Sequence, residues 1–133
     1  MKRLAAIVVV SLAATTACSG KKDANTTTCQ SPPASVAVTG ALAGFPKPAA
    51  VVYTASSIAG PSTIVDGYAA GTVTDLYDAY ASDLSKAPFG VTKKEHDAHD
   101  AEVSFAGSGT TGQVKLGEAC KDRVSVKITV RPA

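Results

Sequence analysis

The chain has 133 residues and a formal net charge of +2, which leaves room for one domain and excludes a TIM barrel or a complete dinucleotide-binding domain. Only 28 residues are Val, Leu, Ile or Phe, whereas 24 are Ala, which contributes little burial energy. The composition therefore predicts a small domain with a thin apolar core.

The first seventeen residues have the organisation of a secretory signal peptide. Lys2 and Arg3 precede an apolar run over residues 4–14, which is too short for the roughly 20 residues of a membrane-spanning helix. The stretch Thr15-Thr16-Ala17-Cys18-Ser19-Gly20 resembles the lipobox of bacterial lipoproteins, with Thr15 where that family usually has an aliphatic residue. This resemblance covers only the first 20 residues. It implies cleavage before Cys18, acyl chains such as palmitate on Cys18, and anchoring on the extracytoplasmic side of the bacterial cell membrane.

Cleavage before Cys18 would leave 116 residues with a net charge of zero, because Lys2 and Arg3 are lost. No basic surface then remains to indicate nucleic-acid binding. We expect residues 18–44, rich in Ser, Thr, Ala, Pro and Gly, to be the lipid anchor and a flexible tether. Residues 45–133 are expected to form a small extracytoplasmic domain.

The three cysteines divide into an anchor and a pair. An odd number of cysteines in an exported protein leaves one unpaired, and lipidation of Cys18 accounts for it. Cys29 and Cys120 are then expected to form a disulfide, which persists in an oxidising compartment. A metal site built on these two cysteines is disfavoured because no close CxxC unit is present.

The hydrophobic pattern of the domain predicts an α+β fold. Strands are expected around residues 49–54 and 62–68, and one amphipathic helix over residues 72–86, with Thr72 as its N-cap. Alternating runs follow, the clearest being residues 124–130, and alternation is typical of antiparallel sheets with one buried face. We predict an antiparallel sheet of four to five strands with one helix packed on one face, in the order β-β-α-β-β-β.

Side-chain parity constrains the hairpins. Pairing Val91 with Phe105 predicts a five-residue loop over residues 96–100. If Leu116 and Ile128 both face the core, the hairpin between them needs an odd-length loop, such as residues 121–123, or a longer one. A tight two-residue turn at Lys121-Asp122 would contradict this expectation.

A glycine-rich stretch, Gly107-Ser108-Gly109-Thr110-Thr111-Gly112, spells GxGxxG. A dinucleotide site needs a helix directly after the glycines, whereas a strand pattern follows here. We therefore interpret the stretch as a hairpin loop and expect no cofactor.

The stretch Glu95-His96-Asp97-Ala98-His99-Asp100 holds both histidines of the chain. Imidazoles and carboxylates are ligands for zinc or copper, so His96, Asp97, His99 and Asp100 are candidate metal ligands. The competing interpretation is a solvated polar loop, since the spacing is not that of the HExxH helix motif and the two rings would point to opposite faces of a strand.

Catalysis has little support in the sequence, since no GxSxG motif accompanies the serines and both histidines lie in one polar stretch. The sequence therefore favours a lipid-anchored, non-catalytic binding or cell-envelope interaction protein. Its expected partners are the membrane and an envelope protein. The alternative is a metal-binding lipoprotein that uses the His96–His99 loop.

The lipid anchor can be tested by mass spectrometry of the mature N-terminus. We expect the protein isolated from membranes to begin at Cys18 and to carry the added mass of acyl chains, because the lipobox resemblance implies both steps. Recovery of the chain with its signal peptide attached and Cys18 unmodified would contradict the prediction.

Overall fold

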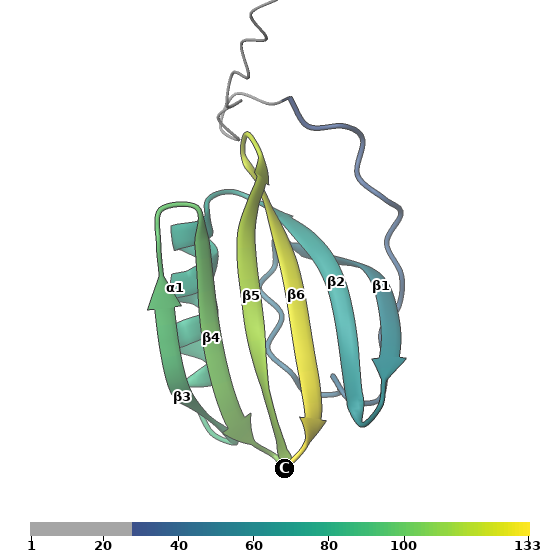
Figure 1. The fold of residues 1–133 in the computed structure, drawn as a ribbon, viewed down its shortest axis with the longest axis vertical. Coiled ribbons are helices and arrows are strands. Elements are labelled where there is room, and N and C mark those ends of the chain that lie inside the picture. The colour runs from purple at the N-terminus through teal and green to yellow at the C-terminus, as the bar shows by residue number, and fades with distance from the viewer. Residues whose placement is uncertain (1–27) are drawn as a thin grey trace, which may run out of the picture.

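The computed structural model describes residues 28–133, so the predicted signal peptide and Cys18 lie outside the described residues. The described chain holds six strands and one helix, shown in Figure 1. In chain order they are β1 (Val51–Ala59), β2 (Ser62–Ala70), α1 (Val73–Leu84), β3 (Phe89–His96), β4 (Asp100–Gly107), β5 (Thr110–Cys120) and β6 (Arg123–Pro132). Within residues 28–133 no helix has the length and apolar character that crossing a membrane requires.

All six strands form one antiparallel sheet in the order β1-β2-β6-β5-β4-β3, and α1 packs against β3, β4 and β5. The α+β class with one helix is confirmed, but the prediction of four to five strands is wrong. Four strands, not three, follow the helix, because each of the four alternating runs is bounded by its own turn.

One face of the sheet carries the core. The predicted alternation is confirmed, since buried residues alternate with more exposed ones over residues 101–105 of β4, 114–116 of β5 and 124–130 of β6. These core residues are Ala101, Val103, Phe105, Val114, Leu116, Val124, Val126, Ile128 and Val130. The helix adds a buried stripe at the expected spacing, formed by Val73, Leu76, Tyr80 and Leu84.

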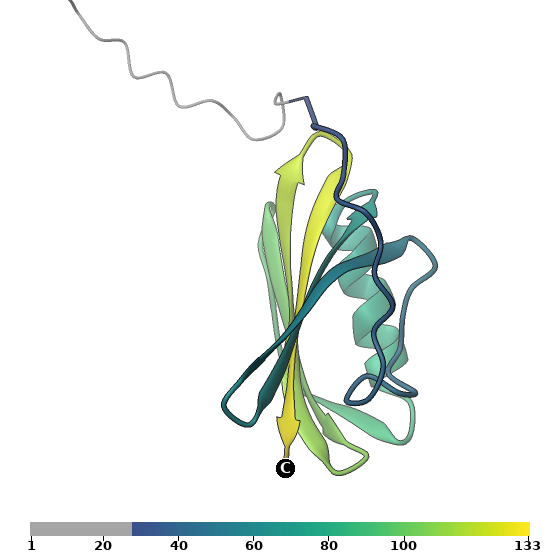
Figure 2. The ribbon, with the colours of Figure 1, turned by 90° about the vertical axis from the view of Figure 1, so that its right-hand side faces the viewer.

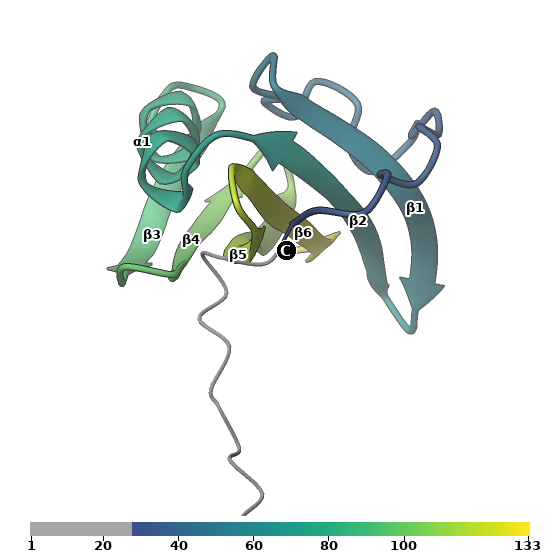
Figure 3. The ribbon, with the colours of Figure 1, turned by 90° about the horizontal axis from the view of Figure 1, so that it is seen from above.

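The segment before β1 closes the rest of this face (Figures 2 and 3). The Val36 amide donates to the Tyr53 carbonyl at 2.8 Å, and Leu42 and Phe45 are buried. The ring of Phe45 lies 5.6 Å from that of Phe89 and 5.0 Å from that of Phe105. Packed structure therefore begins before residue 45, within the range expected to be tether.

The hairpin between β5 and β6 corrects the parity prediction. Cys120 pairs directly with Arg123, so the turn is the tight two-residue Lys121-Asp122, with Asp122 at a φ of 58°. A β-bulge at Ala119 shifts the register between Glu118 and Cys120. The extra residue returns Leu116 and Ile128 to the core side, which a two-residue turn alone would not allow.

A second bulge corrects the β3–β4 hairpin. Val91 pairs with Phe105 as predicted, but the register shifts at Thr92. His96 consequently pairs with Ala101. The loop between the two strands is residues 97–99, shorter than the predicted five residues. The predicted hairpin at the glycine-rich stretch is confirmed, since the turn between β4 and β5 is Ser108-Gly109 with φ values of 53° and 71°.

Helix α1 begins as its sequence predicts. The Thr72 side chain accepts a hydrogen bond from the Asp75 amide at 3.2 Å, which satisfies one of the free N–H groups of the first turn. The helix ends at Leu84, two residues earlier than expected.

Tyr80, in the middle of α1, has a fully buried hydroxyl with no hydrogen-bond partner within the described residues. Burial raises the pKa of Tyr80, and the electrostatic interaction with Tyr53 raises it further. A buried hydroxyl without a partner costs about 1–3 kcal/mol of stability. The aromatic ring is therefore the part of this side chain that stabilises the fold.

We expect Tyr80→Phe to raise the free energy of unfolding by about 1 kcal/mol, because it removes the unpaired hydroxyl and keeps the ring. Urea denaturation followed by circular dichroism measures the change. Tyr77→Phe on the same helix is the matched control and should be close to neutral, since Tyr77 is only partly buried. A loss of stability in Tyr80→Phe would mean that the hydroxyl has a partner in solution.

Candidate functional site

The domain has two distinct ends (Figure 1). One end, which we name the entry end, carries the turn at Lys121-Asp122, the loop of residues 97–99 and the start of α1. The other, the distal end, carries the turn at Ser108-Gly109, the turn between β1 and β2, and the C-terminus, where the Ala133 amide donates to the Gly109 carbonyl at 3.0 Å.

The chain enters the domain at the entry end. Cys29 and Cys120 are joined by a disulfide, with their Cα atoms 5.4 Å apart. The Arg123 guanidinium donates to the Gln30 carbonyl at 2.6 Å and lies over the ring of Tyr68 at 5.3 Å. Residues 29 and 30 are thus fixed to the hairpin of β5 and β6.

The two histidines lie at this end but have different partners. The His96 ring stacks on Tyr77 of α1, with ring centroids 4.7 Å apart, and its Nε2 is 3.1 Å from the Thr74 hydroxyl. The His99 Nδ1 contacts the carboxylate of Glu118 on β5. None of these three partners was identified from the sequence, because α1 and β5 are distant along the chain from the two histidines.

The predicted metal ligands are not brought together. Among residues 28–133, no group of three or more His, Cys, Asp or Glu side chains is arranged to hold a metal ion. His96 turns toward α1 and His99 toward β5, while the Asp97 amide donates to the Asp100 carbonyl and closes the loop. No contact in the described part of the chain therefore favours the metal-binding alternative.

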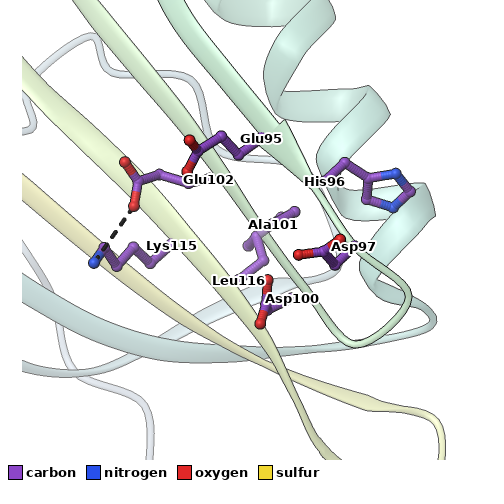
Figure 4. Close-up of a pocket in the computed structure, with 8 residues that line it drawn as sticks. All are labelled: Glu95, His96, Asp97, Asp100, Ala101, Glu102, Lys115 and Leu116. Carbon is purple, nitrogen blue, oxygen red and sulfur yellow. Dashed lines mark ion pairs between the residues drawn. The ribbon is translucent and has the colours of Figure 1, made fainter.

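A hollow at the same end lies over β3, β4 and β5, and its lining is shown in Figure 4. Glu95 and Glu102 are directly opposite each other on β3 and β4. Lys93 lies 2.7 Å from the Glu95 carboxylate and Lys115 lies 3.4 Å from that of Glu102. The hydrogen bond from Lys93 lowers the pKa of Glu95, so this carboxylate is ionised at neutral pH and is not a proton donor.

The face of the sheet opposite the core, which we name the outer face, carries neither α1 nor the segment before β1 (Figure 2). A row of charges crosses it, formed in strand order by Asp66, Lys127, Lys115 and Glu102. Lys115 and Lys127 are directly opposite each other, and each also has an acidic neighbour, Glu102 at 3.4 Å and Asp66 at 3.6 Å. The like charges of the two lysines are thereby balanced within the row.

Neutral hydrogen-bonding groups and one charged residue, Arg131, continue the outer face toward the distal end. A second hollow is lined there by Ser62, Thr92, Ser104, Thr111, Gly112, Gln113, Thr129 and Arg131. Ser104 and Thr129 alternate with core residues in the sequence, which predicts that they face solvent, but nothing in the sequence indicates that the lining residues gather at one place. Gly112 is required by the packing, since a Cβ atom there would lie 2.0 Å from the Thr129 carbonyl oxygen.

Comparison of the chain with protein-family models, with curated proteins and with solved structures finds no match. The described surface therefore has to be interpreted from its own chemistry.

The disulfide should contribute strongly to stability. It joins residues 91 positions apart, and the loss of such a bridge costs about 2–5 kcal/mol in small exported domains. We expect Cys29→Ala/Cys120→Ala to lower the free energy of unfolding by this amount in urea denaturation. The wild type treated with reductant is the control and should behave like the double variant. Two reactive thiols at Cys29 and Cys120 in the native protein would contradict the prediction.

Proposed function

We propose that this chain is a lipid-anchored, extracytoplasmic protein of the bacterial envelope, and that its domain is a non-catalytic binding module whose outer face contacts an envelope protein. The observation that carries the proposal is the combination of a chain entry fixed at one end by a disulfide with a broad polar sheet face left open (Figures 1 and 2).

Anchoring at Cys18 fits the way in which the chain enters the domain. Eleven positions separate Cys18 from Cys29, and a fully extended chain of that length spans at most about 40 Å. The disulfide ties the incoming chain to β5, in the middle of the sheet, and the entry end is then the end nearest the membrane. A bridge between Cys29 and Cys120 also fits an oxidising compartment outside the cytoplasm.

Binding fits the outer face better than catalysis does. The four charged groups of its row are already paired with one another, and its neutral groups are hydroxyls and an amide that can both donate and accept hydrogen bonds. Protein–protein interfaces use about one hydrogen bond per 100–200 Å² and have a polar rim, which such a face can supply. The arrangement therefore suits a partner with a polar surface and low net charge.

The binding face can be tested by site-specific photo-cross-linking of the full chain in membranes. We expect a photoreactive residue at Gln113 or at Thr129 to yield the same partner adduct, because both positions lie in the second hollow. A photoreactive residue at Asp78, an exposed position on α1, is the matched control and should yield no such adduct. Equal adducts at all three positions, or none at the two outer-face positions, would contradict the proposal.

A further inference from the structure

The two edges of the sheet differ in charge. Edge strand β3 carries Lys93, Lys94 and Glu95, whereas edge strand β1 carries no charged residue. Each of the other five strands holds at least one charged residue. The uncharged run that contains β1 extends over residues 48–65.

Charge on an edge strand has a physical role. The free N–H and C=O groups of an edge can pair with another strand, and natural sheets block such pairing with charged side chains, above all lysine, and with bulges. β3 has both features, since its bulge at Thr92 precedes the two lysines. β1 also has a bulge, at Thr54, but lacks the charges.

The two halves of β1 differ in their partners. Before the bulge, the Tyr53 carbonyl accepts from the Val36 amide, so the segment preceding the strand lies along this half of the edge. After the bulge, residues 55–59 make no backbone hydrogen bond other than those with β2, within the part of the chain that the structure describes. Every residue of this second half is exposed. A stretch of five residues is therefore free to pair.

Two exposed apolar side chains lie at separate points along the same edge. Within residues 28–133, only Ile58 and Val36 are large hydrophobic residues with substantial exposure, at 81% and 42%. Ile58 belongs to the free half of β1, and Val36 pairs with the covered half. Single exposed apolar residues are ordinary. Ile58, however, lies on the uncharged half of β1 that has no backbone partner other than β2, where an added strand would cover it.

We propose that the free half of β1 pairs antiparallel with the same strand of a second copy of this chain, so that two six-stranded sheets join edge to edge around a two-fold axis at Ser57. In such an isologous contact each strand faces itself, and charges near the axis would face like charges. β1 is the strand of the sheet whose composition avoids this repulsion, which favours a second copy as its occupant.

The register follows from centring the five free residues. Ser57 lies opposite its own copy, Ala55 opposite Ala59, and Ser56 opposite Ile58. Directly opposite residues point to the same face, so the small side chains of Ala55, Ser57 and Ala59 continue the outer face. The two Ile58 side chains meet diagonally on the other face. A contact of five residues per copy is smaller than the interfaces of stable dimers, so the association is transient and is best detected by covalent trapping.

The test is disulfide trapping of Ser57→Cys in the full chain, isolated in mild detergent. Cys29 and Cys120 are bridged, and the peptide that contains this bridge is verified by mass spectrometry. On oxidation we expect a species of twice the protomer mass, linked through residue 57. Ser82→Cys, at an exposed serine on α1, is the matched control and should give several-fold less.

A second variant tests the register and the charge argument. Adding Ile58→Lys to Ser57→Cys should reduce the trapped dimer several-fold, because it places like charges beside the axis. The fold should be unaffected, since Ile58 is exposed. Equal trapping at residues 57 and 82, trapping that survives Ile58→Lys, or an adduct with a different protein would each overturn the proposal. Loss of the outer-face partner would not affect this result, so the two proposals fail separately.

Discussion

The contact among the three phenylalanines is the point on which the layers of this domain depend. Phe45, Phe89 and Phe105 are all the phenylalanines in the chain, and their ring centroids lie 5.0–5.8 Å apart. They come from the segment before β1, from the edge strand β3 and from β4. Aromatic side chains bury the largest apolar areas available to a protein. A chain poor in large apolar residues thus places all its phenylalanines where three elements meet.

A small number of contacts holds the segment before β1, which has no regular secondary structure. It is attached at the disulfide, at the hydrogen bond from Val36 to Tyr53, and through the buried side chains of Leu42 and Phe45. The disulfide fixes one end of the segment and the phenylalanine contact fixes the other. Together with α1, the segment covers a sheet that is wider than a twelve-residue helix can cover (Figure 3).

The sequence predicts which face of each strand is buried, but it does not predict the exact pairing of the strands. Alternation predicted which residues of β4, β5 and β6 are buried, because a period of two is a property of each strand alone. The bulges at Thr54, Thr92 and Ala119 depend on two strands at once, and nothing in Ala119 or its neighbours announces an extra residue. The parity of the side chains excludes a turn at Lys121-Asp122 only if the ladder between β5 and β6 is regular. The bulge at Ala119 makes that ladder irregular.

The candidate site was predictable to the same extent. The closely spaced histidines and aspartates suggested a shared metal ion. In the structure, His96 contacts Tyr77 and His99 contacts Glu118, and both partners are distant along the chain. The cysteine pairing was predictable because only two cysteines remain once Cys18 is assigned to the anchor. Cys29 and Cys120 accordingly meet as expected, whereas the partners of the histidines required the fold.

Charge distribution connects the two proposed surfaces. The flank formed by α1 and β3 is rich in charged residues, whereas β1 carries none and the segment beside it has Lys47, whose ammonium lies 4.9 Å from the Tyr53 ring centroid (Figure 1). Pairing through β1 leaves the row from Asp66 to Glu102 uncovered, because that row lies on the face and not on the edge. Two outer faces would then adjoin across the small residues of β1. An envelope partner with a repeated or extended surface would gain affinity from engaging both faces at once, since the second contact becomes intramolecular. The proposed contact between copies and the proposed binding face would therefore reinforce each other in one molecule.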